Sequence, residues 1–220
     1  MKILILIMVL FATTLGFSQQ QRDSLHSQIF SLTPLSRKVD KVNGVAFGLG
    51  HGFDKDKVAT INGLNLEINP IIVLEIGFLD PEKLTNDTIT LRHNGLHIST
   101  FGFLGNVAHN GVAISACSVT YSSNGLSVTA LYNMSKNLNG LHIAGITNST
   151  DRAVGLLIAP VNSADVFKGF QLGIYNKSDD MTGVQIGLFN KTGKAKGIQL
   201  GLWNKNEKRS LPFINWNFRD

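Results

Sequence analysis

The side chains that most often carry out chemistry are few in this chain and irregularly spaced. The chain has one cysteine, Cys117, and six histidines: His26, His51, His93, His97, His109 and His142. No Gly-x-Ser-x-Gly motif is present, and no histidine stands where it would activate the Cys117 thiol. Cys117 falls at an alternating position of an expected strand, which predicts a buried thiol. We therefore expect no nucleophilic catalysis and no enzyme activity.

Three histidines close in sequence, His93, His97 and His109, raise the question of a metal site. Zinc needs three or four ligands, and no cysteine or acidic residue is spaced to join these histidines. His97 and His142 also stand at the repeat position that Gln185 occupies later in the chain. We expect them to be polar residues interchangeable with Gln, and we predict neither a metal nor a cofactor.

Three aromatic residues at equivalent repeat positions, Tyr175, Phe189 and Trp203, are candidate binding residues. A ladder of exposed rings could stack on a glycan. The alternative is that the rings pack on one another on a face or at a cap.

One repeated sequence motif, which we call the repeat phrase, organises the chain and must position all of these residues. It reads Gly, apolar, Gln, apolar, Gly, apolar, aromatic, Asn, Lys, and it occurs three times between Lys168 and Lys205. The glycines that open its copies are 14 or 15 residues apart: Gly111, Gly125, Gly140, Gly155, Gly169, Gly183 and Gly197. Gly44, Gly63 and Gly95 open weaker copies. Such regularity is typical of a stacked repeat protein.

Each copy predicts one strand followed by a turn. Val184, Ile186 and Leu188 are apolar, while Gln185 and Gly187 lie between them, so the strand has one apolar face and one small or polar face. The Asn-rich and Lys-rich segments that follow are typical of turns. One copy alone cannot offset the entropy of ordering its backbone, so we expect stacked copies to bury the apolar face.

Two architectures could stack the copies. In a β-solenoid the neighbours are parallel and about 4.8 Å apart, so equal positions touch. Gln171, Gln185 and Gln199 would form one ladder. Six asparagines would form another: Asn133, Asn148, Asn162, Asn176, Asn190 and Asn204. In an antiparallel meander or an outer-membrane β-barrel, each copy would be one strand of about 10 residues plus a hairpin turn.

The turns do not alternate between two types, which favours the solenoid. Pro160 counts against the solenoid, because it falls at an apolar position where it cannot donate a ladder hydrogen bond, unless it lies at a corner. The prediction is an all-β fold, a β-solenoid of about 14-residue coils, with the antiparallel meander or outer-membrane barrel as the alternative.

The amino terminus has the pattern of a Sec-type signal peptide over residues 1–18. Lys2 precedes the apolar run Ile3–Ala12, which is too short to span a membrane as a helix, and Ser18 is a small residue at the expected cleavage site. An exported chain with a single cysteine has no internal disulfide, so packing must stabilise it.

The rest of the chain divides by composition. Residues 19–41 are polar and read as a flexible or partly helical leader. Residues 42–220 form a single β-repeat domain, with regular repeats over 95–210 and a C-terminal cap over 211–220, where the usual phrase is lost.

The net charge is +5, and most of the excess lies late in the chain. The contributing residues are Lys177, Lys191, Lys194, Lys196, Lys205, Lys208 and Arg209. A basic surface of this kind could meet anionic lipid or polysaccharide. No Lys/Arg run of the nucleic-acid-binding type is present, so we expect no nucleic-acid partner.

The segments GVQIGLFN, GIQLGLWN and KRSLPFINWNF resemble the surface-repeat proteins of Gram-negative bacteria, whose repeats run Gly-Leu-Gln-Ile-Gly-Leu-Val-Asn. The match is close over residues 140–218 and weaker over 42–138. The resemblance implies an exported protein at the cell surface, in the outer membrane or in the periplasm, and it implies no known catalytic residues.

We therefore expect a non-enzymatic repeat protein that serves as a structural or binding scaffold of the envelope. Its partner would be envelope polysaccharide, a lipid surface or another surface protein. A small outer-membrane barrel is the alternative function, and an enzyme or a glycan-binding module comes third.

Overall fold

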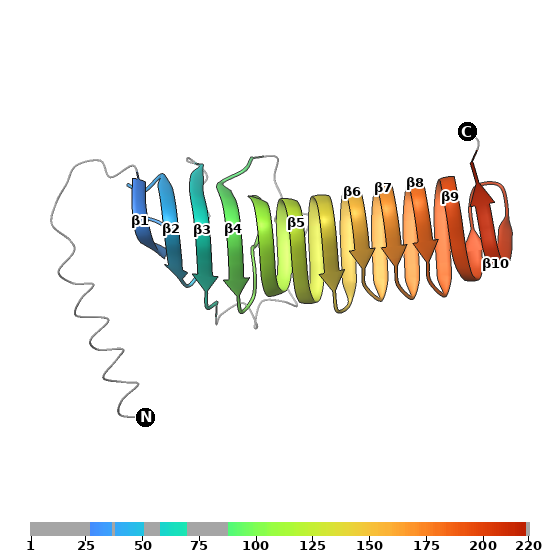
Figure 1. The fold of residues 1–220 in the computed structure, drawn as a ribbon, viewed down its shortest axis with the longest axis horizontal. Helices are drawn as coiled ribbons and strands as arrows, with labels where there is room; N and C mark the ends of the chain where they lie inside the picture. Colours follow the sequence, from blue (N-terminus) through green and yellow to red (C-terminus); the bar gives the residue numbers. More distant parts are fainter. Residues whose placement is uncertain (1–26, 37, 51–57, 70–87, 219–220) are drawn as a thin grey trace, which may run out of the picture.

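A computed structural model describes residues 27–36, 38–50, 58–69 and 88–218. These residues form one ten-stranded sheet in which each strand pairs with its neighbours in sequence, wound about a single axis (Figure 1). The strands are β1 (Ser27–Thr33), β2 (Lys41–Gly48), β3 (Ala59–Glu67), β4 (Leu91–Ser99), β5 (Val107–Ala144), β6 (Thr147–Ile158), β7 (Val161–Leu172), β8 (Tyr175–Ile186), β9 (Phe189–Lys205) and β10 (Ser210–Asn217). The predicted all-β solenoid is confirmed.

Neighbouring coils are parallel and in register, so like residues lie beside like. Gly44 pairs with Gly63, and Gly63 pairs with Gly95, although 19 and 32 residues separate these glycines in the chain. Gly183 pairs with Gly197 in the same way at the other end. Residues 42–103, as far as they are described, therefore belong to the same sheet as the regular repeats, and the antiparallel alternatives are not what the chain adopts.

The last strand reverses direction. β10 pairs antiparallel with β9, with Ile214 beside Leu200 and Asn215 beside Gln199. It lies in the segment that loses the repeat phrase, and it covers the backbone edge that the final coil would otherwise leave open. Residues 219 and 220 of the predicted cap lie outside the described residues.

The solenoid begins earlier than the sequence indicated. β1 pairs parallel with β2, with Leu32 beside Phe47 and Thr33 beside Gly48. The prediction of a flexible or partly helical leader over 19–41 is therefore wrong for Ser27–Thr33. These residues lack the opening glycine, which is why the repeat phrase did not reveal them. Residues 1–18, the predicted signal peptide, lie outside the described residues.

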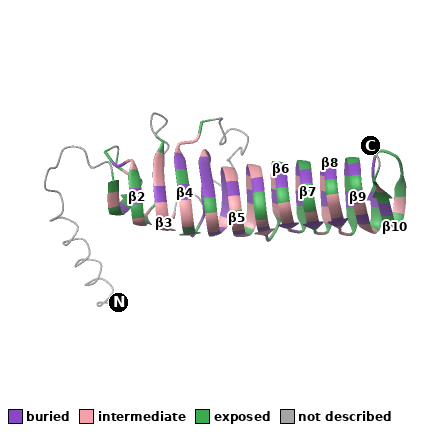
Figure 2. Ribbon diagram, turned by 45° about the horizontal axis from the view of Figure 1, so that its top comes forward, coloured by how far each residue is buried: buried purple, intermediate pink, exposed green. Residues whose placement is uncertain are grey.

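The inside of the coils is largely polar, so the expected burial of the apolar face is wrong. In the coil that opens at Gly183, Gln185 and Asn190 are buried, whereas Leu188 is exposed and Ile186 is only half-buried. Buried, intermediate and exposed segments alternate along the coils (Figure 2). Stacking in register gives the Gln185 and Asn190 amides hydrogen-bond partners one coil away, which offsets the penalty for burying them. The described residues also form three buried apolar clusters, and the one in the later coils consists of Leu138, Ala153, Leu157, Ala164, Phe167, Met181 and Ala195.

The opening glycines are required by close stacking of the backbone. Gly183 has a φ of +137°, a conformation that side chains disfavour. A Cβ atom there would overlap the carbonyl oxygen of Gly169 in the preceding coil. The spacing of these glycines thus fixes where each coil begins.

Candidate functional site: an apolar groove along the coils

The last three coils bend at a second glycine, Gly173, Gly187 or Gly201, and a buried asparagine holds that bend. The Asn176 side chain donates one hydrogen bond to the Ile186 carbonyl oxygen at 2.9 Å and another to the Asn190 Oδ1 at 2.8 Å. Asn190 repeats both contacts with Leu200 and Asn204, at 2.9 and 2.7 Å. The Gly-apolar-aromatic-Asn phrase is therefore a bend and the side chain that satisfies its carbonyl groups.

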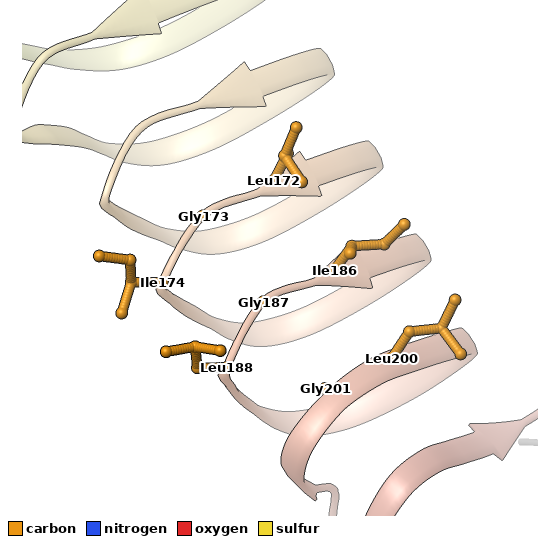
Figure 3. A pocket seen from close by; sticks show the side chains of 8 residues that line it. All are labelled: Leu172, Gly173, Ile174, Ile186, Gly187, Leu188, Leu200 and Gly201. Carbon is orange, nitrogen blue, oxygen red and sulfur yellow. The ribbon is translucent and has the colours of Figure 1, made fainter.

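The bends leave a groove on the outside of the last coils (Figure 3). Its floor is a line of glycines, Gly173, Gly187 and Gly201. One wall consists of Leu172, Ile186 and Leu200, and the other consists of Ile174 and Leu188. The space is about 600 Å³ and open to solvent. No side chain fits at these glycines, because a Cβ at Gly187 or Gly201 would overlap the carbonyl oxygen of the preceding coil's glycine and a ladder asparagine amide.

The groove continues along the solenoid toward earlier coils. A second depression of about 380 Å³ shares Leu172, Gly173 and Ile174 with the first. Ala159 extends the floor, and Pro160 takes the wall position of Ile174 at the bend. Pro160 has no N–H to donate, and the next residue, Val161, donates to the Ile146 carbonyl oxygen at 3.0 Å. Pro160 thus lies at a corner and does not count against the solenoid.

We name the outward aliphatic residues that wall this groove, together with the matching residues Ile146 and Leu202, the apolar band. Ile174 is 53% exposed, Leu188 46% and Leu202 56%. The groove lining contains no acidic, basic or nucleophilic side chain. Such a surface supports binding of an apolar partner rather than proton transfer or nucleophilic attack, and contiguous exposed aliphatic surface marks interaction sites.

The three predicted binding aromatics border the apolar band. Phe189 is 48% exposed and Trp203 is 50% exposed, while Tyr175 is half-buried. Tyr175 and Phe189 are register neighbours. In the described part of the chain no ring-to-ring contact joins the three, so they do not form a closed aromatic stack.

The structure brings together five of the six predicted ladder asparagines. Hydrogen bonds of 3.0, 2.9, 2.8 and 2.7 Å run from each side chain to the next. The members are Asn148, Asn162, Asn176, Asn190 and Asn204. Asn133 is also buried but donates to the Ser127 hydroxyl at 2.7 Å instead. The glutamine ladder has two links of 2.8 Å, from Gln199 to Gln185 and from Gln185 to Gln171.

Sequence analysis missed a second asparagine ladder on the outside of the earlier coils. Its members immediately precede the opening glycines: Asn43, Asn62, Asn94, Asn110, Asn124 and Asn139. Each link is 2.7 or 2.8 Å long. The recurring Asn-Gly dipeptide was the signal that could have revealed it.

The three histidines considered for a metal site do meet inside the solenoid. The Nδ1 atoms of His93 and His109 are 2.9 Å apart, and His97 lies 3.1 Å from the Asn65 side chain. The expectation that no acidic residue joins them is wrong, because a carboxylate oxygen of Glu67 is 4.0 Å from His97 Nε2. Parallel stacking brings Glu67 there from 30 residues away in the chain.

Packing rather than coordination explains this cluster. The Phe103 ring stacks on the His97 ring with centroids 3.7 Å apart, and both residues are buried. In the described part of the chain no group of three or more potential ligands has an arrangement that could hold a metal ion. Burial raises the pKa of Glu67 to about 7, although its hydrogen bond from Asn65 opposes the change.

Burial also changes the pKa values of two histidines inside the coils, His109 and His142. Burial lowers the pKa of His109 to about 4 and that of His142 to about 4, so both are neutral near pH 7. His142 Nδ1 lies 2.7 Å from the Ser127 hydroxyl, one coil away, at the position of the later glutamines. The Cys117 thiol is buried, as predicted.

Comparison of the chain with protein-family models, with curated proteins and with solved structures gives no match. Among the described residues there is no helix of the length and apolar character needed to cross a membrane.

Proposed function

We propose that the protein is a non-enzymatic, exported repeat protein of the cell envelope, and that the solenoid is a scaffold that presents the apolar band to a partner. The observation that carries the proposal is the arrangement of the groove-side segment in the last coils, where Gln185 and Asn190 are buried and aliphatic side chains such as Leu188 are exposed. Ladder hydrogen bonds and close backbone stacking hold the coils, so the aliphatic residues are available for binding.

The magnitude of this surface supports a binding role. Covering a leucine or isoleucine completely is worth about 1.5–3 kcal/mol, so covering a half-exposed one contributes roughly 1 kcal/mol. Ile174, Leu188 and Leu202 follow one another at the same position of successive coils, so one flat or extended partner would cover all three. The signal-like sequence over 1–18 and the resemblance to bacterial surface-repeat proteins support export.

Fractionation of cells that express the full chain tests the proposal. We expect the mature protein to begin at Gln19 by mass spectrometry and to sediment with the envelope. The variant Ile174→Ser/Leu188→Ser/Leu202→Ser should be exported equally but should move to the soluble fraction.

A matched control removes three exposed aliphatic side chains elsewhere on the solenoid, Ile29, Val154 and Val166. The triple serine variant of these residues should remain with the envelope. Retention of the uncleaved chain in the cytoplasm would contradict export. Equal release of both variants, or of neither, would contradict a binding role for the apolar band.

A further inference from the structure

We propose that the groove side of the last three coils docks on the anionic surface of a lipid bilayer. The inference rests on the proposed function and specifies its partner. It is carried by the order of side-chain types across the coil, by the charge that accompanies them, and by the repetition of both in successive coils.

The side chains change in character in a fixed order around each of these coils. First comes the apolar band, then the aromatic positions Phe189 and Trp203, and then a column of lysines, Lys191 and Lys205, two residues further along the chain. Tyr175 and Lys177 hold the same positions one coil earlier. Aliphatic, aromatic and basic zones in this order match the acyl region, the interface and the headgroups of a bilayer.

The lysine column also calls for an anionic partner. Lys177 and Lys191 are register neighbours, so their backbones lie about 4.8 Å apart, and Lys205 follows at the same spacing. In the part of the chain that the structure describes, no ion pair involves any of these three lysines. Like charges stacked so closely repel one another, and a surface of anionic headgroups removes that cost.

Lysine and the aromatic residues suit such a boundary for a further reason. The alkyl stem of lysine lies along apolar surface while its ammonium group reaches the headgroups. Tyrosine and tryptophan place a polar atom at the interface and a hydrophobic ring below it. Interfacial elements of this type enter the bilayer by about 5–10 Å, which is the depth of one layer of side chains.

A second copy of the chain fits the same surface less well. On the other side of the apolar band, Lys168 and Lys196 share one register position with Thr182 between them. Two copies packed face to face would therefore place lysines of one copy opposite lysines of the other in either orientation. Like charges across an interface disfavour association, whereas a bilayer brings the opposite charge to both edges.

Vesicle binding by the purified mature chain tests the inference. The probes are vesicles of neutral phosphatidylcholine alone and vesicles with about 30 mol% phosphatidylglycerol, at low and high salt. We expect binding only to the anionic vesicles, weakening as salt increases. Replacing Lys177, Lys191 and Lys205 by Gln should lower the partition coefficient by roughly 100-fold, since each cation near an anionic surface contributes about fivefold.

The matched control removes three exposed cations from earlier coils, Lys41, Arg92 and Arg152. The corresponding triple Gln variant has the same net charge and should lose less than about tenfold if position matters more than total charge. Fluorescence supplies a second readout. In a Trp216→Phe background the Trp203 emission should shift to the blue on binding, and lipids brominated near the headgroup should quench it.

The outcomes separate this inference from the proposed function. Three outcomes would overturn bilayer docking. They are equal binding to neutral and anionic vesicles, an equal loss of partition coefficient in the two triple Gln variants, and Trp203 fluorescence that brominated lipids do not quench. If vesicles do not bind but the Ile174→Ser/Leu188→Ser/Leu202→Ser variant still leaves the envelope fraction, the scaffold proposal stands and its partner is not lipid. Concentration-dependent dimerisation that this variant abolishes would assign the apolar band to a second copy instead.

Discussion

Replacing Asn176 by Ala should destabilise the solenoid far more than its size suggests. The Asn176 amide donates at 2.9 Å to the Ile186 carbonyl oxygen and at 2.8 Å to Asn190 Oδ1, and its own oxygen accepts from Asn162 at 2.9 Å. The variant loses all three hydrogen bonds, each worth about 0.5–1.5 kcal/mol net. The buried Asn190 Oδ1 also loses its donor from the preceding coil, which costs roughly 1–3 kcal/mol.

The expected loss is therefore about 3–5 kcal/mol in the free energy of unfolding. For a chain of 220 residues this corresponds to a fall in Tm of roughly 10 °C. Thermal unfolding followed by far-UV circular dichroism measures it. Because repeat arrays can unfold in parts, hydrogen exchange of β7, β8 and β9 should show whether the loss is local to the neighbouring coils.

The matched control is Asn139→Ala on the outer ladder. Asn139 is exposed and donates to Asn124 Oδ1 at 2.7 Å, but water can replace that bond. We expect a change in Tm of under about 2 °C. If Asn176→Ala lowers the Tm no more than Asn139→Ala does, the buried ladder does not hold the coils together.

Two further predictions follow from the coil interior. Gly183→Ala should prevent native stacking or lower the Tm by more than 10 °C, because its Cβ would overlap the Gly169 carbonyl oxygen and the φ of +137° is strained for alanine; a stable Gly183→Ala variant with unchanged hydrogen exchange would contradict the stacking geometry. Stability should be greatest near pH 6.5–7, as urea midpoints across pH 4–8 will show. Glu67, whose pKa rises from 4.5 to about 7, contributes stability that is full below pH 4.5 and lost as the pH rises through 7. His109 and His142, whose pKa values fall from 6.5 to about 4, contribute stability that is full above pH 6.5 and lost as the pH falls toward 4. Between pH 4.5 and 6.5 two protons on the histidines outweigh one on the carboxyl, so stability should rise by about 1.4 kcal/mol per pH unit, and a flat profile there would contradict the burial of these groups.

The sequence was sufficient to predict the parallel stacking of the regular coils, but not the first strand, β1, or the reversal at β10. Glycines 14 or 15 residues apart, followed from Gly125 onward by Asn seven or eight residues later, specify coils that stack in register, as the pairing of Gly183 with Gly197 shows. Spacing in sequence becomes contact in space only in a parallel stack, and the uniform turns distinguished that arrangement from an antiparallel one.

The sequence was not sufficient to predict which face points inward. Alternation of Gln185 with Val184 and Ile186 fits either orientation, and the usual preference for buried aliphatic residues selected the wrong one. The preference fails here because identical amides in adjacent coils satisfy one another, as the bond of 2.8 Å between Gln185 and Gln171 shows. Partners of this kind are visible only once the register is known.

The candidate site was also only partly predictable from the sequence. Tyr175, Phe189 and Trp203 were recognisable as a column, and two of them are about half exposed. The groove beside them was not recognisable, because its floor glycines look like ordinary turn residues until the bend places Leu188 outside. The meeting of Glu67 with His97 was also hidden, since a segment of irregular length separates their coils.

Cysteine accessibility is the most direct measurement of the inside-out arrangement. In a Cys117→Ser background, the single-cysteine variants Leu188→Cys and Ala195→Cys would each be treated with a water-soluble maleimide under native conditions. Leu188 lies between β8 and β9 and is 46% exposed, whereas Ala195 lies in β9 and is 6% exposed. Both residues are aliphatic, and they are seven positions apart in the sequence. The account predicts fast labelling of Leu188→Cys and slow labelling of Ala195→Cys until urea unfolds the chain. Protection of Leu188→Cys together with fast labelling of Ala195→Cys would contradict it.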